Sequence, residues 1–250
     1  MNDVMTSGPT PARSPWFLRP PAPSGLAARV FCFPRSGTGA SAFSAWPAAI
    51  GAAQVCPIQF PGRENRLAEP HYGTYEQLAD SLVEPLTPLL DRPFAFFGHC
   101  AGAMPAFETV LRLAERSLPL PSCLIVSGQP APRYAGSDRM LALTEAELRA
   151  ELEAVVRGRG IEPRPDMIDL GMLTLRGDVA AARAYRRDEP VALGCPVVVL
   201  QWRDDLDVRP DHIQEWRRYA DPVEIRVVDG GPQDFATPPE ELSKVLAGWM

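Results

Sequence analysis

The sequence has no long apolar run, no excess of basic charge and no paired cysteine motif. No apolar segment approaches the roughly 18 residues that a membrane-spanning helix requires. Acidic residues outnumber basic ones, 31 to 25, and a net charge of −6 does not indicate nucleic-acid binding. The five cysteines are scattered and lack C-x-x-C spacing, which indicates reduced residues in a cytoplasmic protein. We expect no metal site, no bound cofactor, no nucleic-acid partner and no membrane partner.

The N-terminus also lacks the apolar core of a signal peptide. Residues 1–25 consist mostly of Pro, Ser, Thr, Ala and Arg, and we expect them to form a flexible leader. The chain is 46% apolar, so residues 26–250 can form a single domain with a full core.

Short apolar segments alternate with helical patterns along this domain. Strands are predicted at Ala28–Phe33, Gln54–Gln59, Pro93–Phe97, Ser122–Ser127, Pro196–Gln201 and Val223–Val228. Amphipathic helices are predicted at Tyr75–Leu89, Gly102–Arg116 and His212–Tyr219. The alternation predicts an α/β fold with a mostly parallel sheet and helices on both of its faces.

The pentapeptide GHCAG at positions 98–102 lies between a predicted strand and a predicted helix. A G-x-nucleophile-x-G sequence in this place is typical of the nucleophile elbow of α/β-hydrolases. The nucleophile is then Cys100, where most elbows carry serine. We expect the start of the next helix to lower the pKa of this thiol. A buried structural cysteine is the alternative.

Residues from about 135 to 188 interrupt the alternation. A capped helix is predicted from Thr144, and a second one from Arg176 to Tyr185. A helical insertion between two late strands of this fold usually forms a lid over the nucleophile. Packing helices away from the site are the alternative.

An oxyanion hole in this fold uses the N–H that follows the nucleophile and one from the loop after the first strand. These rules select Ala101 and, in the glycine-rich loop 33–40, Ser36. The triad acid is expected just past Pro196–Gln201, where Asp204, Asp205 and Asp207 cluster; a solvated turn is the alternative.

The histidine expected after the last strand is missing, because positions 229–235 read DGGPQDF. The chain has three histidines, His71, His99 and His212, and for each a structural role is the first expectation. His71 follows a loop at the active-site end of its strand and is the one that can reach the nucleophile.

Nearly the whole chain after the leader resembles the type II thioesterases, which are stand-alone α/β-hydrolases of polyketide and nonribosomal peptide synthesis. Matching segments include Cys32-Phe33-Pro34, Gln59–Glu64, Phe94–His99, Ala106-Phe107-Glu108, Arg176-Gly177-Asp178, Tyr185, Cys195-Pro196 and Gly230-Gly231. The resemblance implies an α/β-hydrolase fold with a helical lid. It also implies a substrate held as a thioester on the phosphopantetheine arm of an acyl or peptidyl carrier protein.

By position, the resemblance makes Cys100 the nucleophile and Asp205 the triad acid, since residues 205–208 fit the family's D-x-x-V pattern. The oxyanion donors are Ser36 and Ala101. Two departures stand out: the family's serine is Cys100, and its Gly-Gly-His ends in Pro232. A one-residue shift would place Gln233 in the histidine's position instead.

A thiol needs less help from a base than a hydroxyl does, so an acyl-Cys intermediate can form without histidine. Hydrolysis of that intermediate does need a base, so we expect transfer or cyclisation of the acyl group rather than plain hydrolysis. Arg35, His71 and Asp234 are candidate accessory residues. The alternatives are a non-catalytic carrier-binding relative and a lid-pocket enzyme that works without an acyl-enzyme.

Overall fold

The computed structural model describes residues 14–18, 25–158 and 160–250. Its centre is a seven-stranded sheet of order β2-β3-β1-β4-β5-β6-β7. The strands are β1 (Ala28–Phe33), β2 (Ala49–Ile50), β3 (Ala53–Pro57), β4 (Phe94–His99), β5 (Cys123–Ser127), β6 (Val197–Trp202) and β7 (Val223–Val228). β2 pairs antiparallel with β3, and the other neighbours pair in parallel. The expected α/β architecture is confirmed.

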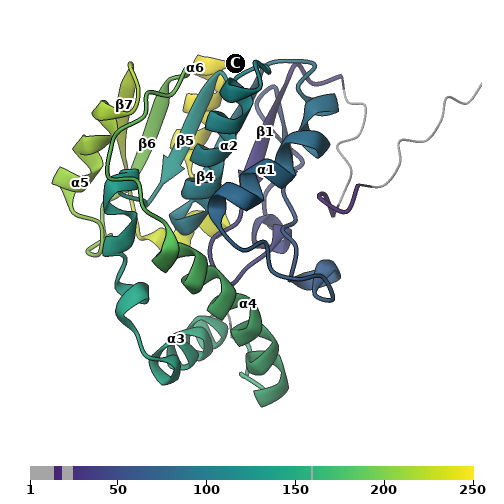
Figure 1. Cartoon of the computed structure of the whole chain (residues 1–250), viewed down its shortest axis with the longest axis vertical. Helices are drawn as coiled ribbons and strands as arrows, with labels where there is room; N and C mark the ends of the chain where they lie inside the picture. Colours follow the sequence, from purple (N-terminus) through teal and green to yellow (C-terminus); the bar gives the residue numbers. More distant parts are fainter. Residues whose placement is uncertain (1–13, 19–24, 159) are drawn as a thin grey trace, which may run out of the picture.

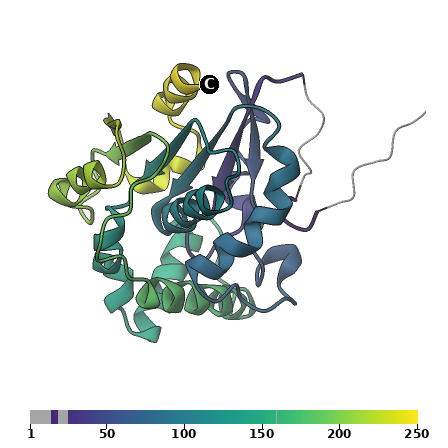
Figure 2. The same cartoon turned by 45° about the horizontal axis from the view of Figure 1, so that its top comes forward.

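Helices cover both faces of the sheet (Figures 1 and 2). The α-helices are α1 (Tyr75–Leu86), α2 (Ala103–Glu115), α3 (Glu145–Gly158), α4 (Pro165–Ala184), α5 (Pro210–Gln214) and α6 (Glu240–Trp249). The 3₁₀ segments are η1 (Ala40–Phe43), η2 (Glu64–Arg66), η3 (Thr87–Leu89), η4 (Cys100–Gly102), η5 (Pro132–Ser137), η6 (Arg139–Ala142), η7 (Glu215–Arg218) and η8 (Pro232–Ala236).

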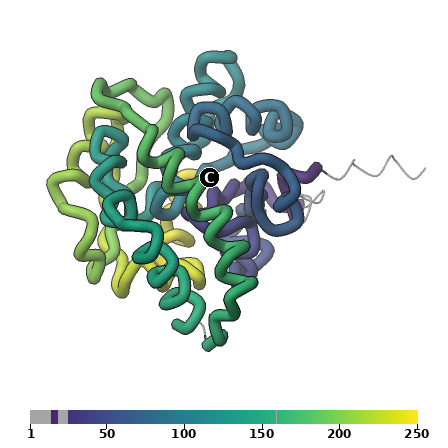
Figure 3. Tube along the Cα trace, turned by 60° about the horizontal axis from the view of Figure 1, so that its bottom comes forward, coloured from purple at the N-terminus to yellow at the C-terminus, as the bar shows by residue number. Residues whose placement is uncertain are grey.

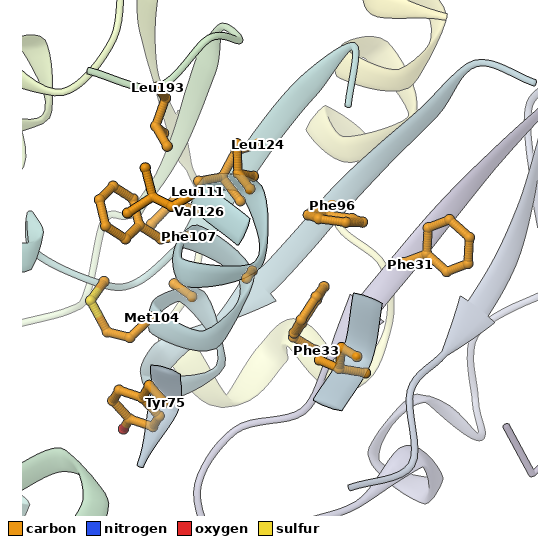
Figure 4. Packing of buried hydrophobic residues seen from close by; sticks show 14 of the residues in the cluster. Phe31, Phe33, Tyr75, Phe96, Met104, Phe107, Leu111, Leu124, Val126 and Leu193 are labelled. Atoms are coloured by element: carbon orange, nitrogen blue, oxygen red, sulfur yellow. The ribbon is translucent and has the colours of Figure 1, made fainter. Parts of the chain in front are cut away.

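Side chains alternate between two apolar layers because successive residues of a strand point to opposite faces. On β1, Phe31 and Phe33 pack toward α1 and α2, whereas Val30 and Cys32 pack toward η1 and α6. Figure 4 shows the first layer, in which Phe33 and Phe96 lie beside α2. Burial on both faces fixes the register of the central strands, and so fixes which strand ends meet at one edge.

Elements between β5 and β6 form a helical insertion of residues 132–184, made of η5, η6, α3 and α4. Figure 3 shows α3 and α4 side by side across one end of the molecule. Their shared apolar cluster centres on Leu148, Met172 and Leu175. Beyond α4, the Tyr185 hydroxyl donates to the buried Glu108 of α2 at 2.7 Å. The insertion therefore has a small core of its own and a fixed attachment to the main domain.

Some element boundaries differ from the sequence expectations. β2 and α6 were not predicted, and α4 begins at Pro165 rather than at Arg176. The predicted helix 75–89 ends as an α-helix at Leu86 and continues as η3, because Pro85 and Pro88 supply no backbone donor. The predicted helix 212–219 is the short α5 followed by η7.

Most of the expected leader lies outside the described residues, but residues 14–18 pack on the domain. Phe17 is buried and forms an antiparallel bridge with Ile58. The Arg66 guanidinium lies 4.3 Å from the Trp16 ring centroid. This short part of the expected leader therefore contacts the domain. Within the described residues, no helix has the length and apolarity needed to cross a membrane.

Candidate active site

Cys100 sits at the turn between β4 and α2, in the left-handed region with a φ of +50°. Two glycines allow this turn. A Cβ at Gly98 would lie 2.4 Å from the Ala103 Cα, and one at Gly102 would lie 2.5 Å from the Phe33 carbonyl oxygen. Both distances are shorter than a Cβ atom tolerates, so only glycine at these two positions allows so tight a turn. The tight turn presents Cys100 at the sheet edge, as a nucleophile elbow does.

The two expected oxyanion donors lie beside this cysteine. β1 pairs with β4 so that Phe33 is opposite Gly98, which places the loop after β1 next to the elbow. Ser36 and Ala101 line the same cavity as Cys100. The Ala101 N–H interacts with the sulfur and lowers the thiol pKa, although other effects outweigh it. Parallel pairing of β1 and β4 thus brings the residues of a nucleophile and an oxyanion hole together.

Asp205 also lines this cavity, at the end of β6. Its Oδ1 accepts hydrogen bonds from the N–H groups of Asp207 and Val208, at 3.1 and 3.3 Å. Burial raises the pKa of its carboxyl, and the charges of Asp207 and Asp138 raise it further. No hydrogen bond from a histidine to Asp205 occurs among the described residues. The carboxylate thus stands in the acid's place without the imidazole it would orient.

His71 and His212 are engaged outside the cavity, whereas His99 is one of its lining residues. His71 Nε2 lies 2.8 Å from Asp178 Oδ1, and the His212 ring stacks on Tyr134 at 3.8 Å between centroids. His99 is fully buried, with Nδ1 at 3.0 Å from the Ser127 hydroxyl. Burial lowers the pKa of His99 to about 3, so its ring stays neutral. His71, expected as an accessory residue, is not among the residues that line the cavity.

Pro232 occupies the start of η8, where the sequence lacks the histidine. Pro232 and Gln233 line the cavity, and Gln233 Oε1 accepts a hydrogen bond of 2.8 Å from Arg35 Nη1. Arg35 also lies over the Phe235 ring, 5.4 Å from its centroid. Asp234, another expected accessory residue, instead caps η8 by accepting the Gly231 N–H at 2.8 Å. Of the three accessory candidates, the structure brings only Arg35 to the cavity.

Asp138, at the start of η6, is a cavity residue that the sequence did not indicate. Its Oδ1 accepts the Met140 N–H at 2.8 Å, and burial raises the pKa of its carboxyl. Its charge also raises the pKa of the Cys100 thiol. The only signal in the sequence is that aspartate often precedes a helical turn. That signal says nothing about which side chain the insertion brings above Cys100.

The cavity has a volume of about 240 Å³ and is lined by both apolar and polar side chains. The helical insertion contributes apolar side chains, among them Met140, Leu152, Leu175 and Val179. Polar groups come from the sheet edge around Cys100 and from the insertion, which adds Asp138, Arg139 and Glu151. Concave sites of this kind, apolar with a few placed polar groups, are suited to small organic groups. A short acyl chain against the insertion would place its carbonyl at the elbow.

Burial raises the pKa of the Cys100 thiol to about 12, and the charge of Asp138 adds to this. Arg35 and the Ala101 N–H act in the opposite direction without reversing the shift. The expectation that the helix start lowers this pKa is therefore wrong, because desolvation of the thiolate outweighs the helix dipole. The other four cysteines are free and buried, as expected.

Alkylation of Cys100 by iodoacetamide should become about tenfold faster for each pH unit between roughly pH 7 and pH 10. A thiol with a pKa of about 12 remains mostly protonated throughout this range. An ordinary thiol would level off above its pKa of about 8.5. The rate is measured from the mass of the modified peptide, with glutathione as the reference. A plateau near pH 8 would contradict the raised pKa.

Comparison with known proteins points to one family. The model of the thioesterase domain matches residues 28–237. The chain is similar to the gramicidin S biosynthesis protein GrsT of Aneurinibacillus migulanus, at 33% identity over 215 residues that cover 81% of this chain and 80% of that protein.

Solved structures give the same picture. RedJ, a thioesterase from the prodiginine biosynthetic pathway in Streptomyces coelicolor, is 31% identical with a TM-score of 0.75, over 96% of this chain and 95% of that one. The type II thioesterase BorB from the borrelidin biosynthetic cluster is 28% identical with a TM-score of 0.77, over 93% of this chain and 95% of that one.

Proposed function

The chain belongs to the thioesterase family and has its α/β-hydrolase fold, and from that premise we propose that it moves acyl groups held as thioesters on a carrier protein. The similarity to GrsT and BorB supports a place in polyketide or nonribosomal peptide synthesis, and the proposed location is the cytoplasm. The substrate arrives on the phosphopantetheine arm of the carrier, so the protein needs no cofactor of its own.

The proposal of an acyl-Cys100 intermediate that is transferred or cyclised rests on one observation. The elbow presents Cys100, and Pro232 stands where a triad histidine is expected. The Cys100 sulfur attacks the thioester carbonyl, and the oxygen of the tetrahedral intermediate lies between the N–H groups of Ser36 and Ala101. The bond to the pantetheine sulfur then breaks. The proton from Cys100 leaves with that sulfur, and the acyl group remains on Cys100.

In the second step the acyl group leaves Cys100, without the histidine that assists hydrolysis in the usual triad. Water attacks an acyl-cysteine well only when a base removes its proton, and such help is worth about 10²–10⁴ in rate. His99 is the one imidazole among the described residues that line the cavity, and because burial lowers its pKa to about 3 it is a poor base. A second carrier thiol, or a nucleophile within the acyl chain, needs this help less. The acyl group is therefore transferred or cyclised, and Cys100 recovers its proton from the attacking group.

The raised thiol pKa favours a second candidate, a carrier-binding relative without catalysis. A pKa of about 12 makes the thiolate scarce at pH 7. A more basic thiolate is also a better nucleophile, with a Brønsted slope of about 0.4–0.5, so attack slows by only about 10² relative to an ordinary thiol. A slow nucleophile held next to its thioester still reacts, because proximity contributes far more than this loss.

Transfer and hydrolysis are separated by offering both acceptors. The protein is mixed with a hexanoyl-loaded carrier protein, with or without a second, unloaded carrier of different mass. We expect the hexanoyl group on the second carrier to exceed free hexanoic acid at least tenfold, because the thiol needs no base. Intact-protein mass spectrometry and chromatography of the acid give the two amounts. Free acid as the main product, whether or not the second carrier is present, would contradict the transfer.

A further inference from the structure

Asp178 is a buried carboxylate on α4 that accepts five hydrogen bonds. Its Oδ1 accepts from Arg63 Nη2, His71 Nε2 and the Tyr72 hydroxyl, each at 2.8 Å. Its Oδ2 accepts from the Gly37 N–H at 2.7 Å and from Arg63 Nη1 at 3.0 Å. Its side chain is 2% exposed. Such a group is costly to bury unless every donor is in place.

The charge state of Asp178 follows from these partners. Burial alone would raise its pKa, but the charge of Arg63 and the hydrogen bonds lower it to about 2. His71 Nδ1 accepts the Gly73 N–H at 3.2 Å, which assigns the ring proton to Nε2, facing Asp178. The carboxylate is thus ionised and faces only donors.

Four of the five bonds hold Asp178, and the fifth acts on the oxyanion loop. Gly37 directly follows Ser36, the expected oxyanion donor, in the loop after β1. Arg63 Nη1 also donates to the Thr38 carbonyl oxygen at 2.8 Å. The Arg63–Asp178 pair therefore binds this loop at two neighbouring groups, the N–H of Gly37 and the carbonyl oxygen of Thr38. The hydrogen bond from the Gly37 N–H to Asp178 on α4 thus fixes the orientation of the peptide group between Ser36 and Gly37.

The close fit of α4 on the main domain supports this attachment. A Cβ at Gly177 would lie 2.5 Å from the His71 Cδ2, so only glycine lets the His71 ring lie against the helix and reach Asp178. The Thr174 hydroxyl donates to the Gly62 carbonyl oxygen at 3.2 Å. A Cβ at Gly37 would already touch the Leu175 side chain at 3.4 Å. Helix α4 thus lies directly on the oxyanion loop.

We infer that Asp178 is a positioning residue, which uses the seating of α4 to hold the Ser36 N–H in its oxyanion-binding orientation. The inference rests on the proposed acylation of Cys100. Asp178 touches no reacting atom; it acts through Gly37. When α4 packs on the main domain, Asp178 holds the oxyanion loop and the oxyanion hole has both of its donors. When α4 moves away, the Gly37 N–H loses its acceptor and the hole loses one donor.

The test compares two ligands of equal length in wild-type protein and Asp178→Asn. Hexanal forms a hemithioacetal with Cys100 whose oxygen occupies the oxyanion hole, whereas hexanamide binds without attack. Loss of one oxyanion donor typically weakens the stabilisation of the oxyanion by a factor of about 10²–10³. We therefore expect the affinity for hexanal to fall at least 10²-fold, while the affinity for hexanamide changes less than threefold. Asp169→Asn, on the exposed face of the same helix, should change neither affinity.

Equal losses for both ligands, or no loss for hexanal, would overturn the inference. A wild-type protein that forms no hexanal adduct at Cys100 would overturn the proposed function itself, and this inference with it. Should Asp178→Asn fail to fold, hydrogen exchange on the wild type decides the question. The Gly37 amide should then exchange at the same denaturant-dependent rate as the amides of α4. Exchange of Gly37 independent of α4 would show that the helix does not hold the loop.

Discussion

Incubated with a hexanoyl-loaded carrier protein, the wild-type chain should gain the mass of one hexanoyl group, and Cys100→Ala should gain none. Cys100 is the cysteine that the elbow brings to the cavity, and the other four are buried in the core. Because the proposed deacylation step lacks an effective base, the adduct should accumulate to a detectable level. Intact-protein mass spectrometry measures the adduct, and peptide mapping places it.

Two further variants make this result specific. Cys56→Ala removes a buried thiol far along the chain and should keep the full adduct. Cys100→Ser restores the residue that most elbows carry, yet it should show less than a hundredth of the adduct. A hydroxyl without a base stays protonated and attacks poorly. Carrier deacylation that survives Cys100→Ala would instead favour the lid-pocket enzyme without an acyl-enzyme.

Pro232→His should raise the rate of hydrolysis of the hexanoyl-enzyme by about 10²–10⁴, the usual contribution of general-base catalysis. Position 232 lines the cavity, and Asp205 has no imidazole to orient. The change should be tolerated by the fold, since the first position of a helical turn needs no proline and its N–H has no partner within the turn. Release of hexanoic acid under single-turnover conditions measures the rate.

Two controls separate the imidazole from the loss of proline. Pro232→Ala removes the ring without adding a base and should leave the rate within about threefold of wild type. Asp205→Asn in the Pro232→His background should lose most of the gain, because the new imidazole is then held in the wrong tautomer. An unchanged hydrolysis rate in Pro232→His would show that the missing histidine is not what limits release of the acyl group.

The sheet and the elbow were predictable because their signals are local. Each central strand is a short apolar run, and Gly98 and Gly102 flank Cys100 at a spacing that only one kind of turn requires. The meeting of Ser36, Ala101 and Asp205 at one cavity then follows from parallel strands that end at one edge. The two-residue strand β2 and the C-terminal helix α6 have weaker patterns and were missed.

The remaining part of the site depends on how the helical insertion packs on the main domain. No local sequence pattern encodes that packing. Asp138 lines the cavity from the start of η6, and His71 is held by Asp178 because α4 packs on the loops of the main domain. The thiol pKa of Cys100 was misjudged for a similar reason. The helix start is visible in the sequence, whereas the burial that outweighs it comes from residues far away along the chain.

The burial of the Cys100 sulfur has a consequence for oxidative damage. Peroxides attack the thiolate and convert it stepwise to sulfenic, sulfinic and sulfonic acids, the last two mostly without return. Because desolvation raises the pKa of the Cys100 thiol, this side chain is mostly protonated at pH 7. The environment that slows the proposed acylation should therefore also shield the Cys100 sulfur from peroxide.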